Sequence, residues 1–215
     1  MDAFITASQQ DLLVDLAYVV SAVLFVMGLK GLSHPRTAVS GNRKGAAAML
    51  VAIVATLLDQ QVLSYELIFA GLAIGTIVGG ILAVRVQTTE MPQLVGTFNG
   101  FGGIASILVA GGALMAAVGG GEEISAQVSV ATVASALIGS VTFWGSLVAV
   151  CKLQGIIVPS GAVTSPVLKG MNLLFALGAI ALCVLSATSP ENIQLFWILV
   201  GVASVLGITL VVPIG

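Results

Sequence analysis

Two stretches of the chain place amides and hydroxyls among apolar residues, and these groups are the best able to carry chemistry. The first begins at Thr89 and reads TEMPQLVGTFNGFGG, with one amide, Asn99, among glycines. Small or polar residues recur there at spacings of three and four, which places them on one face of a helix: Pro92, Gly96, Asn99, Gly103, Ser106 and Ala110. An amide does not titrate near neutral pH, so Asn99 could hold a water molecule but could not itself relay a proton.

The second stretch repeats this pattern with hydroxyls: Thr132, Ser135, Gly139, Thr142 and Ser146 share one face. Two interpretations stay open for both faces. Polar groups in a membrane helix often form interhelical hydrogen bonds, or bond the carbonyl four residues back, with no further role. They also mark paths for water and protons. Two such faces on successive helices favour a shared hydrated seam.

Other candidate residues indicate packing rather than catalysis. Gly71, Gly75 and Gly79 form a doubled GxxxG pattern, typical of close helix contact, and Gly96 and Gly103 suit the same purpose. The single histidine, His34, has no thiolate or carboxylate nearby, so we expect no metal site. No glycine fingerprint joins a strand to a helix, so we expect no bound cofactor. We also expect no catalytic residue in this chain.

The composition requires a membrane protein. Of the 215 residues, 58% are hydrophobic and only 7% are charged, whereas a water-facing surface needs about 25% charged residues. The apolar runs approach the ~20 residues of a spanning helix and lack the alternation of barrel strands. We predict an all-α polytopic membrane helix bundle over residues 16–215 after an extracytoplasmic tail, 1–15, with seven helices: 16–32, 45–63, 67–84, 93–118, 129–151, 170–189 and 193–213. Asp59 interrupts the apolar run of the second predicted helix, which could therefore be a tilted or partial span.

The charges predict the orientation of these helices. With seven crossings, all seven Lys and Arg residues fall on one side, together with Glu90, and the other eight acids fall on the opposite side. Short loops rich in Lys and Arg mark the cytoplasmic face. We therefore expect the N-terminus outside and the C-terminus in the cytoplasm.

Several motifs together resemble one family. The runs GLSHPRTAVSGN, TEMPQLVGTFNGFGGIAS, GSVTFWGSLVAVCKLQG, KGMNLL and LVVPIG are similar to the membrane part of the beta subunit of proton-translocating NAD(P) transhydrogenase, over essentially the whole chain. The resemblance implies a protein of the bacterial inner membrane. It also implies that a proton crosses the membrane domain while hydride passes from NADH to NADP in soluble domains.

The resemblance assigns roles to particular residues. It places Glu90 near the cytoplasmic mouth of a proton path that Asn99, Ser146 and Thr142 line, and it makes loop 33–44 a contact of the moving NADP-binding domain. Many relatives carry a histidine where this chain has Asn99, and some with asparagine there have the histidine on a membrane helix of the alpha subunit. The titrating group is therefore expected elsewhere than at Asn99.

The resemblance further implies partners that complete the enzyme. The family continues beyond LVVPIG with more membrane helices and the NADP(H)-binding domain, so we expect this chain to be a fragment or a split subunit with no catalysis of its own. Expected partners are the membrane helices of the alpha subunit, the remaining beta segments, a second copy of the complex and the lipid bilayer, but no nucleic acid. NAD(H) and NADP(H) would bind only in the complete enzyme.

Three alternatives remain open at this stage. A seven-helix receptor fits the helix count, although the last predicted helix lacks the lysine of a retinal protein and aromatic residues make up only 6% of the chain. A secondary transporter would show inverted repeats or broken helices, and we find neither. A structural membrane subunit is the third, and the two polar faces argue modestly against it.

Overall fold

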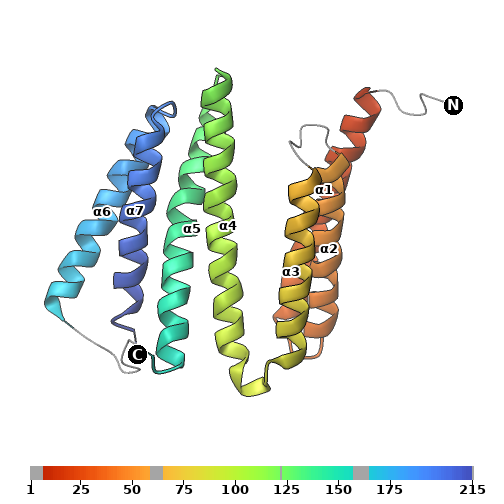
Figure 1. Ribbon diagram of the computed structural model, residues 1–215, viewed down its shortest axis with the longest axis horizontal. Coiled ribbons are helices and arrows are strands. Elements are labelled where there is room, and N and C mark those ends of the chain that lie inside the picture. The colour runs from red at the N-terminus through yellow and green to blue at the C-terminus, as the bar shows by residue number, and fades with distance from the viewer. Residues whose placement is uncertain (1–6, 59–64, 122, 157–164, 215) are drawn as a thin grey trace. The chain divides into compact units, whose positions relative to one another are not determined.

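A computed structural model of the chain describes residues 7–58, 65–121, 123–156 and 165–214. Those residues form seven α-helices and one short 3-10 helix, with no strand among them (Figure 1). The α-helices are α1 (Ala7–Leu32), α2 (Ala38–Leu58), α3 (Tyr65–Arg85), α4 (Met91–Gly120), α5 (Ala126–Leu153), α6 (Pro166–Thr188) and α7 (Ile193–Val211). All seven are long and apolar enough to cross a membrane. The predicted all-α polytopic bundle is confirmed.

Six of the seven helices begin before their predicted first residue, and the difference is largest for α1 and α2. Helix α1 starts at Ala7 rather than residue 16, and α2 starts at Ala38 rather than residue 45. Hydropathy marks where lipid begins, whereas polar residues such as Arg43 and Lys44 continue a helix into water without disrupting its hydrogen bonds. The predicted end of the second helix, residue 63, lies outside the described residues.

The first of two compact units, Met1–Val84, is built on the pair α1 and α2. Glycines let the two backbones touch, because a β-carbon added to Gly31 would lie 2.7 Å from the Cα of Gly41. Ser21 donates a hydrogen bond from its hydroxyl to the Ala48 carbonyl at 2.8 Å, deep in the same contact. Helix α3 joins the pair through the Tyr65 hydroxyl, which donates to the carbonyl of Leu57 at 3.2 Å.

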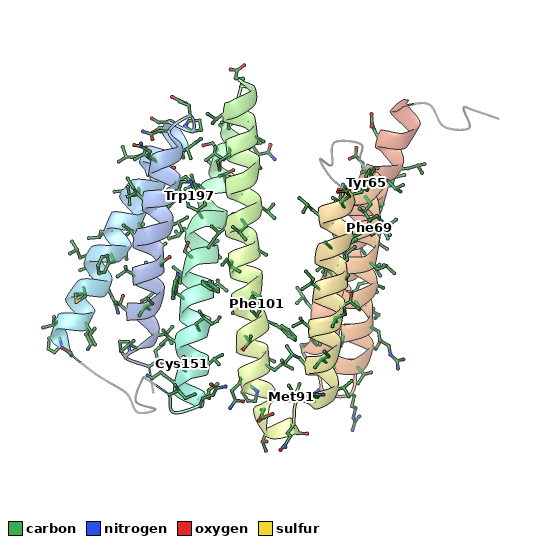
Figure 2. All side chains as sticks on the ribbon, viewed as in Figure 1. Tyr65, Phe69, Met91, Phe101, Cys151 and Trp197 are labelled. Carbon is green, nitrogen blue, oxygen red and sulfur yellow. The ribbon has the colours of Figure 1, made fainter. Side chains whose placement is uncertain are left out.

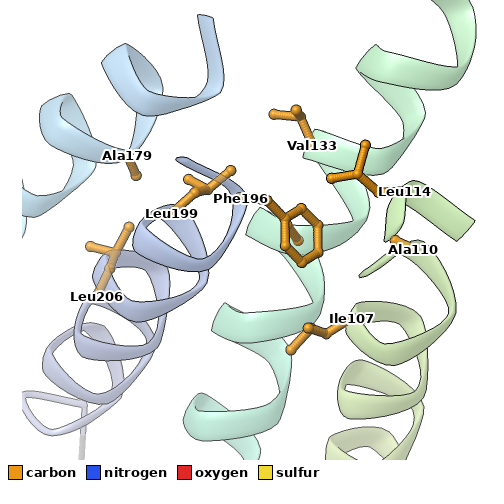
Figure 3. Close-up of a cluster of buried hydrophobic side chains, with 9 residues drawn as sticks. Ile107, Ala110, Leu114, Val133, Ala179, Phe196, Leu199 and Leu206 are labelled. Carbon is orange, nitrogen blue, oxygen red and sulfur yellow. The ribbon is translucent and has the colours of Figure 1, made fainter. Parts of the chain in front are cut away.

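The second unit, Arg85–Gly215, is organised around α5, which packs against α4, α6 and α7. Its apolar core lies where these helices meet, as Figure 3 shows for Phe196 and the side chains around it. Phe196 and Leu199 of α7 are fully buried. The core comprises Ile107, Ala110, Leu114, Val133, Ala136, Ala179, Phe196, Leu199 and Leu206.

Large apolar side chains also cover the outer surfaces of the helices (Figure 2). Phe69 on α3 and Phe101 on α4 are 60% and 59% exposed. Such surfaces would be unstable in water, because burying an aromatic side chain is worth roughly 1.5–3 kcal/mol. Lipid or further membrane helices must cover them, so the chain is a multi-pass membrane protein.

Candidate functional site

Asn99 on α4 and Ser146 on α5 are hydrogen-bonded to each other. The amide nitrogen Nδ2 of Asn99 donates to the hydroxyl oxygen Oγ of Ser146 at 2.9 Å. Ser146 is buried, with 9% of its surface exposed, whereas Asn99 is exposed along the open side of the contact. The two polar residues that the sequence singled out on different helices thus form one pair.

Glycines on α4 bring the two helices close enough for this bond. A β-carbon added to Gly103 would lie 2.6 Å from the carbonyl oxygen of Gly139, and one added to Gly96 would lie 2.8 Å from Cγ2 of Val150. The Gly139 carbonyl is backbone and cannot move aside, so only glycine fits where Gly103 lies. A larger residue in place of Gly96 would force the Val150 side chain to shift. The structure therefore places Gly96 and Gly103 directly against α5.

An open groove runs along the same contact. Near Asn99 it has a volume of about 400 Å³, and Gly102, Ser106, Ser135 and Thr142 are among the residues lining it. A neighbouring groove of about 490 Å³ shares Ser106 and Ser135 and extends to Thr132. The small and polar faces predicted for the two stretches therefore meet along a single seam.

The hydroxyls of the seam differ in how they are satisfied. Ser106 donates to the carbonyl of Gly102, four residues back on its own helix, at 3.0 Å. This local bond is the ordinary arrangement of a serine in a membrane helix. Ser146 instead accepts from the neighbouring helix, so it and Asn99 form a cross-helix polar contact beside the groove.

Glu90 lies at the start of α4, outside the groove. Its carboxylate accepts a hydrogen bond from the backbone N–H of Gln87 at 3.3 Å, and Pro92 occupies the first turn, where its missing N–H costs no bond. Nine residues separate Glu90 from Asn99, or about 13 Å along the helix axis. The structure brings Thr142 to the groove with Asn99 and leaves Glu90 at the helix entrance.

The glycines of α3 have a different environment. A β-carbon added to Gly71, Gly75 or Gly79 would meet no atom within 4 Å in the part of the chain that the structure describes. No residue of α3 is buried. A packing role for this GxxxG face stays a prediction.

Sequence reasoning missed two residues that matter in the second unit. Gly100 is buried, and a β-carbon there would contact the Ser146 side chain at 3.4 Å. It follows Gly96 by four residues, a spacing that could have indicated its role. Lys152 is also buried, and its ammonium group donates to the backbone carbonyls of Val212, at 2.7 Å, and Ile214.

The groove beside Asn99 is lined by neutral groups, which are able to bind water, rather than by groups that exchange protons. An amide and a hydroxyl supply both donors and acceptors, and neither titrates near neutral pH. Such a site can hold and orient water inside a membrane protein. Any proton that moves through it needs a titrating group from elsewhere.

Comparisons with known proteins agree with this membrane architecture. The family model described as NAD(P) transhydrogenase beta subunit matches residues 14–215. Two curated relatives, both named NAD(P) transhydrogenase subunit beta and both from Rhodospirillum rubrum, are 37% identical to the chain over 203 residues. Each alignment covers 93% of this chain and 43% of the relative, so the chain spans less than half the length of these relatives.

Proposed function

The chain belongs to the NAD(P) transhydrogenase beta subunit family, and from that premise we propose that the α4–α5 groove is part of a proton path across the membrane. The complete enzyme would couple this path to hydride transfer from NADH to NADP in soluble domains outside this chain. The Asn99–Ser146 hydrogen bond carries the proposal, because it places a water-binding amide and hydroxyl together beside an open groove within the membrane-spanning unit.

In this proposal each polar residue has a separate task. Asn99 and Ser146 hold a water molecule beside the groove, where the amide oxygen can still accept and the hydroxyl proton can still be donated. Thr142 lines the groove one turn away on α5. Glu90, exposed at the entrance of α4, supplies a carboxylate near the mouth.

The titrating group comes from a partner in this proposal. Asn99 is exposed on the open side of the groove, so a membrane helix of the alpha subunit can approach it there. A histidine on such a helix would titrate near neutral pH. The remaining beta segments, a second copy of the complex and the NADP-binding domain complete the assembly, which we place in the bacterial inner membrane with the basic loops in the cytoplasm.

The test is the substitution Asn99→Leu in the complete complex. Leucine has nearly the shape of asparagine but no polar atoms, so it removes the water site with little change in packing. We expect proton-coupled transhydrogenation in sealed vesicles to fall at least about tenfold, equivalent to about 1.4 kcal/mol. Co-purification of the alpha subunit should be unchanged.

Thr97→Val is the matched control. Thr97 lies on the same helix, and its hydroxyl donates to the carbonyl of Gln93 at 2.8 Å rather than to α5. This variant should keep its coupled turnover within a factor of about two, as expected for a site away from the path. Undiminished proton pumping by an assembled Asn99→Leu complex would overturn the proposed path.

A further inference from the structure

A large cavity lies at the end of the first unit where α1 turns into α2. Its volume is about 930 Å³, against about 400 Å³ for the groove beside Asn99. It includes residues of loop 33–44, and most of the residues that line it are polar or basic. The ones that matter here are Lys30, Ser33, His34, Arg36, Thr37 and Lys44.

Three cations face this cavity from three successive segments. Lys30 is in the last turn of α1, Arg36 is in the connecting loop, and Lys44 is in the second turn of α2. Within the described residues, none of the three forms an ion pair with a carboxylate. Three positive charges around one cavity attract an anion, and multiply charged phosphate groups suit such a cluster.

The loop between α1 and α2, which carries Arg36, is stabilised by local hydrogen bonds. The Thr37 hydroxyl donates to the Gly31 carbonyl at 2.6 Å, and the Ser33 hydroxyl donates to the Lys30 carbonyl at 2.7 Å. The contact between Gly31 and Gly41 holds the two helices together beneath the loop. Helix α2 also begins at the cavity, so the positive end of its dipole adds to the field of the cations.

The apolar surroundings favour a lipid over a soluble anion. Met27 forms part of the cavity wall, and the outward face of α1 continues into the membrane with exposed Val26 and Leu29. A phospholipid could place its headgroup among the cations and its acyl chains along this face. Basic pockets between membrane helices are typical binding sites for anionic lipid headgroups.

We propose that this cavity binds the phosphate group of an anionic phospholipid, held by Lys30, Arg36 and Lys44. The site lies in the unit Met1–Val84, whereas Asn99 and Ser146 lie in the unit Arg85–Gly215. The bound lipid anchors the α1–α2 hairpin at the membrane surface. Its acyl chains cover part of the exposed apolar face of α1.

Native mass spectrometry of the complete complex in a zwitterionic detergent tests this site. The probe is phosphatidylglycerol, titrated against phosphatidylcholine with the same acyl chains. Each cation near an anionic lipid contributes about 1 kcal/mol, so Arg36→Gln should weaken phosphatidylglycerol binding about fivefold and Arg36→Gln/Lys44→Gln about thirtyfold. Phosphatidylcholine binding should not change.

Arg43→Gln is the control, because it removes the same charge from the neighbouring position but does not line the cavity. It should retain phosphatidylglycerol binding, and inorganic phosphate in large excess should displace little of the lipid from the wild-type complex. If Arg43→Gln and Arg36→Gln weaken phosphatidylglycerol binding equally, the binding reflects general surface charge rather than this cavity, and the proposal is overturned. Full displacement by inorganic phosphate would also overturn it, because it would indicate a soluble anion instead.

The same variants distinguish a bound lipid from a protein docked at this loop. If the loop instead docks the NADP-binding domain, Arg36→Gln/Lys44→Gln lowers hydride transfer while phosphatidylglycerol binding stays at the wild-type level. That outcome overturns the lipid site without affecting the proposed proton path, which the Asn99→Leu variant tests separately.

Discussion

The backbones of Gly103 and Gly139 meet where α4 crosses α5, and a β-carbon on either residue would lie 2.6 Å from the carbonyl oxygen of the other. Asn99 is one turn before Gly103 on α4, and it reaches Ser146 across the same interface at 2.9 Å. The glycine contact sets the spacing of the helices, and this spacing brings the amide within hydrogen-bonding distance. Packing and polar chemistry therefore depend on one another here.

Gly103→Ala should disrupt this interface. The added methyl group has no room against the Gly139 carbonyl, and overpacking of this kind typically costs about 1–3 kcal/mol. Gly112→Ala on the same helix is the control, since a β-carbon there meets no described atom within 4 Å. In thermal unfolding of the complete complex in detergent, Gly103→Ala should lower the midpoint temperature and Gly112→Ala should not. Equal midpoints for the two variants would contradict the close contact.

The Asn99–Ser146 pair should show energetic coupling in a double-mutant cycle. Asn99→Ala and Ser146→Ala each remove one partner of the hydrogen bond. The double variant should therefore lose less unfolding free energy than the two single variants lose in total. A hydrogen bond of this kind is expected to give a coupling energy of about 0.5–1.5 kcal/mol in unfolding experiments.

Ser204 supplies the control for that cycle, because its hydroxyl donates to the carbonyl of Val200 on its own helix at 2.6 Å. Asn99→Ala combined with Ser204→Ala should be additive within about 0.5 kcal/mol. If the losses of stability from Asn99→Ala and Ser146→Ala were also additive, the hydrogen bond between these two residues would make no contribution to stability.

The orientation of the chain can be measured by thiol labelling. Glu123 precedes α5 and Gln154 follows it, and both are exposed. With seven crossings, the basic residues are predicted to share the side of Gln154, so we expect that side to be cytoplasmic. In a variant with Cys151 and Cys183 replaced by serine, a membrane-impermeant maleimide should label Glu123→Cys in intact cells and Gln154→Cys only after permeabilisation. The reverse pattern would invert the topology.

The sequence predicts individual helix faces well because helical periodicity is local. The spacing of Gly96, Asn99 and Gly103 identified the face of α4 that meets α5. Periodicity does not identify the neighbour that a face contacts, so the packing of Phe196 of α7 beside Gly111 of α4 could not be foreseen. Helix ends in water were missed for a similar reason, since hydropathy reports the membrane boundary rather than the last hydrogen bond.

The burial of Lys152 could not be predicted from the sequence either. A lysine next to Cys151 at the end of an apolar run predicts a charge at the membrane surface, where its side chain reaches water. In the structure the lysine is 8% exposed and bonds two carbonyls at the end of α7, some sixty residues later in the chain. Only the tertiary contact between α5 and α7 brings these carbonyls within its reach.

Lys152→Met should therefore loosen the contact between α5 and α7. The substitution keeps most of the side-chain volume but leaves the carbonyls of Val212 and Ile214 without their charged donor, and hydrogen bonds to charged groups contribute about 1.5–3 kcal/mol. Lys169→Met, at an exposed position in the first turn of α6, is the matched control and should change stability by less than about 0.5 kcal/mol. Thermal unfolding of the complete complex measures both variants. A Lys152→Met complex as stable as the Lys169→Met complex would show that the cost of burying the ammonium group cancels what its hydrogen bonds contribute.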